Sequence, residues 1–149
     1  MAKDSIKIDV SELHDLLRKI NEASGKTLRL LDRAIDESAI LLDEKAKEKI
    51  QKGTRSGKTY RRGGKSGRRS AAGEAPKTDT GRLVSSIRPD FKGFMDAEVG
   101  SLANIAPYGG ILEDPDKLNR PWLKPTLDEN EPAIWKKLDR AIKAGGLAS

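Results

Sequence analysis

The sequence predicts an α+β fold, because helical and strand patterns occupy separate stretches of one 149-residue chain. Apolar residues recur every three or four positions at 26–52 and again at 134–142, which indicates two helices. Apolar and polar residues alternate at 87–101 on both sides of a turn signal, which indicates a β-hairpin. A chain of this length is expected to form one domain, residues 1–149, with its own core.

The first half of the chain is predicted to be mainly helical. Ile6, Ile8 and Val10 indicate a short strand or an extended arm at 5–10, ahead of a helical region at 11–52. The helix predicted at Lys26–Lys52 would span about 40 Å, so it must lie across a sheet or against a neighbouring subunit. Glycine 53 is expected to end it as a C-cap.

Residues 54–70 are strongly basic. They include seven cations and no acid: Arg55, Lys58, Arg61, Arg62, Lys65, Arg68 and Arg69. These cations account for the formal net charge of +6, since the other 22 basic residues face 23 acidic ones. With so few apolar residues, we expect a long mobile loop at 53–75. Two interpretations stay open: a phosphate-facing patch, or a solvated loop that acids of a neighbouring subunit could order.

The stretch Glu74–Ile87 predicts a loop that becomes a capped helix at 79–87, within a helix–hairpin–helix region that covers residues 76–145. Three side chains could accept hydrogen bonds from its first N–H groups: Thr78, Asp79 and Thr80. Leu83 and Ile87 lie four positions apart and are expected to face the core. Gly81 would allow a close backbone approach, and Arg82 would be free to pair outward.

The last third of the chain predicts connectors and a final helix. Residues 108–113 indicate a short helix or an irregular turn, and residues 120–125 an extended segment anchored by Trp122. We expect the final helix to begin between residues 126 and 132, because the proline at 132 is tolerated best in a first turn. A pair of glycines at 145 and 146 is expected to end this helix.

No residue pattern predicts catalysis. The chain has no cysteine, so it can form neither a disulfide nor a thiolate metal site. His14 is the only histidine, and Ser85 and Ser86 fit the polar face of a short helix better than a nucleophile. The Gly-Lys-Ser at 64–66 lacks the spacing of a phosphate loop. We expect a soluble, non-secreted protein that is not an enzyme and has no cofactor or metal.

Several short motifs follow one another in order. They are Arg55-Ser-Gly-Lys-Thr-Tyr-Arg-Arg62, Ser70-Ala-Ala-Gly-Glu-Ala-Pro76, Thr78-Asp-Thr-Gly-Arg-Leu83 with Ser86-Ile87, Pro107-Tyr108 with Leu112-Glu113, and Arg120-Pro-Trp-Leu-Lys-Pro-Thr-Leu127. Together they resemble the small tail-component, or minor tail, family of long-tailed bacteriophages, whose members lie between the head connector and the tail tube. The resemblance covers residues 55–144 and singles out motif residues with a structural role: Asp79, Thr80, Gly81, Arg82, Leu83, Ile87, Tyr108, Glu113, Pro121 and Trp122.

The resemblance implies a long helix packed on a small, mainly antiparallel sheet, followed by a C-terminal helix. It also implies a ring, commonly a hexamer, around the channel that DNA traverses in a virion neck or tail assembled in the host cytoplasm. The implied partners are further copies of the chain, a head-completion or connector protein and the tail tube protein. One departure is Asp114-Pro115-Asp116, which stands where the family usually carries aromatic-Gly-Thr.

Two functions are therefore expected. The first is a structural virion protein that completes or terminates the tail and joins it to the head connector. In this case the seven cations contact DNA in the channel or a neighbouring subunit. The second is a nucleic-acid-binding module that uses residues 54–70 as its arm. The first predicts defined oligomers, and the second predicts salt-sensitive DNA binding by the isolated protein.

Overall fold

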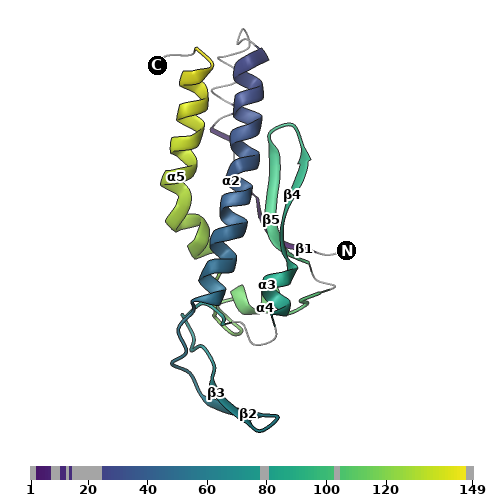
Figure 1. Cartoon of the computed structure of the whole chain (residues 1–149), viewed down its shortest axis with the longest axis vertical. Helices are drawn as coiled ribbons and strands as arrows, with labels where there is room; N and C mark the ends of the chain where they lie inside the picture. Colours follow the sequence, from purple (N-terminus) through teal and green to yellow (C-terminus); the bar gives the residue numbers. More distant parts are fainter. Residues whose placement is uncertain are drawn as a thin grey trace.

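The computed structural model describes residues 3–7, 11, 12, 14, 25–77, 81–102 and 105–146. Its elements are β1 (Lys3–Lys7), α2 (Gly25–Gln51), β2 (Thr59–Arg62), β3 (Lys65–Arg68), α3 (Arg82–Ser86), β4 (Ile87–Gly93), β5 (Asp96–Leu102), α4 (Gly109–Glu113) and α5 (Leu123–Ala144). The two long helices lie side by side, and a three-stranded sheet packs on α2 (Figure 1). The fold is α+β, as predicted. Of the strand expected at 5–10, the structure describes residues 5–7, within β1.

The central element of the fold is α2, which confirms the longest predicted helix to within one residue at each end. Six positions of its predicted apolar stripe are at most 3% exposed: Leu31, Ile35, Ala39, Leu42, Ala46 and Ile50. The stripe is wide because α2 packs on α5 along one flank and on β4 and β5 along another. Gly53 does not adopt the positive φ expected of a C-cap. Instead a Cβ there would lie 3.2 Å from the Ala75 carbonyl oxygen, so a close backbone approach favours glycine.

The C-terminal helix α5 runs antiparallel to α2 and holds it at both ends. The Thr27 hydroxyl donates to the Gly145 carbonyl at 3.0 Å, and Lys49 Nζ lies 2.7 Å from Glu129 Oε1 near the other end. The predicted stop at two glycines is confirmed, since α5 ends at Ala144 and Gly146 has φ 89°. The predicted start was wrong: α5 begins at Leu123, not between 126 and 132, and its proline at 132 lies inside the helix.

The early start of α5 has a cause outside the helix itself. Glu113, at the end of α4, accepts hydrogen bonds from three successive backbone N–H groups: those of Trp122 (2.7 Å), Leu123 (3.0 Å) and Lys124 (2.9 Å). The next residue, Pro125, has no N–H to satisfy. Residues 123–125 are therefore helical, where an extended segment was expected. The Trp122 side chain anchors this end as predicted, with no exposed surface and its Nε1 donating to the Gly109 carbonyl at 3.4 Å.

The sheet has the strand order β1-β5-β4 and is antiparallel throughout. The predicted β-hairpin is confirmed as β4 and β5, paired with Ile87 opposite Ser101 and Phe91 opposite Ala97. Residues of β5 that face α2 are buried, with Ala97 at 2% and Val99 at 1% exposure. Phe91 continues the predicted alternation but is 50% exposed, because it lies on the edge strand where the register shifts before Gly93.

The short helix α3 is smaller than the helix predicted at 79–87. It covers only Arg82–Ser86, and Ile87 belongs to β4 because its backbone pairs with β5 opposite Ser101. Leu83 and Ile87 are nevertheless buried, at 5% and 1% exposure, as predicted. The expected capping residues 78–80 lie outside the described residues. Gly81, which precedes the helix, has φ 76°, a backbone conformation that favours glycine. The close backbone approach predicted at Gly81 was wrong, because a Cβ there would have no described neighbour within 4 Å.

We expect Glu113→Ala to lower the free energy of unfolding by about 1–3 kcal/mol, because three N–H groups at the start of α5 lose their acceptor. Urea unfolding, followed by circular dichroism, measures this change. The control is Glu44→Ala, which removes an exposed glutamate of α2. Equal stability of the two variants would contradict the capping role of Glu113.

Candidate functional site: a basic hairpin and the pocket at its base

Most of the basic segment forms a β-hairpin. β2 and β3 are antiparallel, with Thr59 opposite Arg68 and Arg62 opposite Lys65. The two residues between them, Gly63 and Gly64, have φ 57° and 76°, which a tight two-residue hairpin turn requires. The predicted loop at 53–75 is therefore wrong for residues 59–68. The Gly-Gly pair was the available sequence signal, but the strands lack the apolar alternation that identifies most hairpins.

The hairpin extends beyond the end of α2, away from the helices and the sheet (Figure 1). Apart from pairing with each other, β2 and β3 do not pack broadly on any helix or strand of the described chain. All seven predicted cations of the basic segment are exposed. The hairpin is therefore an arm that presents positive charge at one end of the molecule.

An aromatic ring organises the middle of the arm. Tyr60 lies opposite Gly67, and a Cβ on Gly67 would lie 3.2 Å from two atoms of the Tyr60 ring, so the ring covers this glycine. The Arg69 guanidinium lies 5.6 Å from the centre of the same ring, which is cation–π distance. The ring of Tyr60 thus stabilises the arm through contacts within it.

The arm is closed at its base by backbone pairing and by one carboxylate. Gly57 N–H donates to the Arg69 carbonyl at 2.8 Å, and Arg69 N–H donates to the Lys58 carbonyl at 3.1 Å. Glu74 accepts the N–H of Ala71 at 2.7 Å, the N–H of Ser56 at 3.2 Å and the Ser56 hydroxyl. These bonds, the one from the Ser56 hydroxyl foremost, lower the pKa of Glu74 below its ordinary 4.5.

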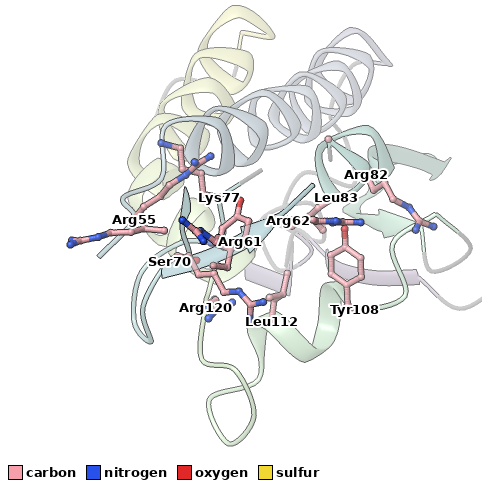
Figure 2. A pocket seen from close by; sticks show the side chains of 15 residues that line it. Arg55, Arg61, Arg62, Ser70, Lys77, Arg82, Leu83, Tyr108, Leu112 and Arg120 are labelled. Atoms are coloured by element: carbon pink, nitrogen blue, oxygen red, sulfur yellow. The ribbon is translucent and has the colours of Figure 1, made fainter. Parts of the chain in front are cut away.

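A pocket of about 690 Å³ opens where the arm meets the body (Figure 2). Eight cations are found among its described lining residues, and no acid: Arg55, Arg61, Arg62, Arg68, Arg69, Lys77, Arg82 and Arg120. Its other lining residues are Tyr60, Ser70, Pro76, Gly81, Leu83, Tyr108 and Leu112. The pocket thus draws on the arm, α3, α4 and the segment before α5, and it suits an anion.

The structure brings some predicted site residues together and separates others. Five of the seven cations line the pocket, together with the motif residues Gly81, Arg82, Leu83 and Tyr108. Lys58 and Lys65 are exposed on the arm but do not line the pocket. Glu113, Pro121 and Trp122 belong to the junction of α4 and α5. Asp79 and Thr80 lie outside the described residues.

Two pocket cations were missed by sequence reasoning, Lys77 and Arg120. Both lie outside the charged run, and only the folded chain brings them to its base. Arg120 stands out because its Nε–H is buried and has no acceptor among the described residues. Its place at the start of the motif Arg120-Pro-Trp was the one available signal. A buried donor without a partner is costly.

Other kinds of site find little support in the described part of the chain. It holds no group of three or more His, Cys, Asp or Glu residues that could bind a metal ion. His14 is exposed there. None of the described helices combines the length and the apolar character that crossing a bilayer needs. Comparisons with protein-family models, curated proteins and solved structures each found no match.

We expect the base of the arm to loosen at acid pH. The folded-state pKa of Glu74 is lowered, so its contribution is complete above pH 4.5 and is lost as the pH falls through that lowered pKa. Amide chemical shifts of Ala71 and Ser56 in an NMR titration measure this loss, with a midpoint below 4.5. The transition should be absent in Glu74→Gln. A midpoint at or above 4.5 in the unaltered protein would contradict the contacts described.

Proposed function

We propose that this protein is a structural subunit of a phage neck or tail end. It would form a ring, a hexamer by family resemblance, that completes or terminates the tail and joins it to the head connector. The proposal rests on the ordered motifs of residues 55–127 and on a fold that agrees with what their resemblance implies. Its place of action would be the virion, after assembly in the host cytoplasm.

The arm is the observation that carries the proposal. An isolated two-stranded hairpin is marginally stable in water, and this one gains little packing from its own subunit. A protein whose cations lie on an arm beyond its core has a surface suited to contacts outside the subunit. In a ring, such an arm would reach a neighbouring copy, the connector, the tail tube protein or the DNA in the channel.

The motif residues outside the arm support a scaffolding role. Leu83, Ile87 and Trp122 are buried in the core. Glu113 accepts three backbone hydrogen bonds at the start of α5. Each of these residues stabilises the fold of the described chain, as expected for a subunit with a structural role in an assembly.

A second function is favoured by the exposure of the seven cations, namely a nucleic-acid-binding module that uses the arm. If all seven met phosphates of duplex DNA, the logarithm of the binding constant would fall with the logarithm of salt concentration with a slope of about −6. This binding would need no ring. Salt-dependent DNA binding by a monomer therefore distinguishes the module from the structural subunit.

We expect the purified protein to form a defined oligomer in native mass spectrometry, and phage lacking it to accumulate unjoined heads and tails or tails of uncontrolled length. Electron microscopy of lysates distinguishes these two defects and so separates completion from termination. The control is complementation with the unaltered gene. A protein that stays monomeric and joins neither heads nor tails would refute the ring.

A further inference from the structure

The pocket at the base of the arm gathers positive charge from separate parts of the sequence. Its cations come from the arm and from Lys77, Arg82 and Arg120, and none of its described lining residues is an acid. Like charges held together in a concave site repel one another, and an anion relieves this repulsion. Seven of the eight cations are arginines, whose planar guanidinium binds carboxylate or phosphate through two parallel hydrogen bonds.

The aromatic residues of the pocket argue against a single nucleic-acid strand. Proteins that bind such strands stack bases on open aromatic faces. Here the ring of Tyr60 is in contact with Gly67 and lies near the Arg69 guanidinium. Tyr108 is partly buried and packs against the core. Neither ring therefore offers a free platform, and a base could stack on Tyr60 only by displacing contacts that hold the arm.

The shape of the pocket argues against duplex DNA. A duplex presents its phosphates on a convex cylinder, which would meet the outer cations of the arm rather than enter a cavity of about 690 Å³. An extended peptide can enter, and a short peptide with several acids brings one charge with each acidic residue.

We propose that this pocket binds an extended acidic peptide segment, carrying several carboxylates, from a neighbouring protein chain. The proposal builds on the ring, because an assembled particle supplies neighbouring chains. Its test is separate, because peptide binding can be measured whether or not a ring forms.

Fluorescence anisotropy with the full-length protein and labelled hexaglutamate tests the proposal near physiological salt. We expect saturable binding, little binding of hexaglutamine, and weaker competition by an oligothymidylate of equal charge than by unlabelled hexaglutamate. Stronger competition by the oligothymidylate would overturn the proposal in favour of a nucleic-acid site. Equal binding of hexaglutamine would overturn it as well.

Variants separate the pocket from the general charge of the arm. Arg82→Gln with Arg120→Gln removes two lining cations outside the arm and should weaken hexaglutamate binding by about tenfold or more. The matched control, Lys58→Gln with Lys65→Gln, removes two arm cations outside the pocket and should change binding less than about twofold. Equal losses in the two double variants would refute a specific pocket. If the first pair does not fold by circular dichroism, Lys77→Gln with Arg61→Gln takes its place.

The source of the acidic segment can be identified in the same preparation. If it belongs to a second copy of this chain, hexaglutamate and the Arg82→Gln/Arg120→Gln variant should both dissociate the oligomer seen by native mass spectrometry. If it belongs to another protein, the oligomer should persist while hexaglutamate still binds. Both outcomes support an acidic-peptide site. A ring without peptide binding would refute this inference and leave the proposed function intact.

Discussion

The junction of α4 and α5 depends on one carboxylate. Glu113 accepts the N–H groups of residues 122–124 and so fixes where α5 begins. The same contact seats Trp122, which has no exposed surface and reaches back to the Gly109 carbonyl. Because α5 packs along α2, this junction also sets how the two long helices meet. Tyr108, Leu112 and Arg120 flank it and line the pocket, so the body of the fold and the candidate site share one support.

Local patterns predicted the parts of the fold that depend on local forces. The position of α2 follows from a repeat of three and four residues, and the β4–β5 hairpin follows from alternation around a turn. The start of α5 does not follow from a local pattern, because the residue that caps it lies ten residues upstream in a separate helix. The arm was missed for another reason. Its strands carry cations in place of an apolar face, and contacts such as Tyr60 on Gly67 take the place of a core.

The candidate site was predicted in composition but not in shape. The charged run identified five pocket cations, since clustering along the chain brings residues together without any knowledge of the fold. Lys77, Arg82 and Arg120 reach the same pocket only because α3 and the α4–α5 junction lie against the base of the arm. The resemblance to phage tail components drew attention to Arg82 and Glu113, but assigned them no contacts. The structure supplies those contacts for Glu113.

The positive charge of the pocket also depends on which groups the nearby acidic side chains bind. Glu74 lies in sequence between the lining residues Ser70 and Pro76, and Glu113 directly follows Leu112. Both direct their carboxylate oxygens to backbone N–H groups, where they close the arm and begin α5. Carboxylates held in this way are poorly placed to pair with the arginines as well. Neither of these two carboxylates is among the described residues that line the pocket, so its described lining stays positively charged.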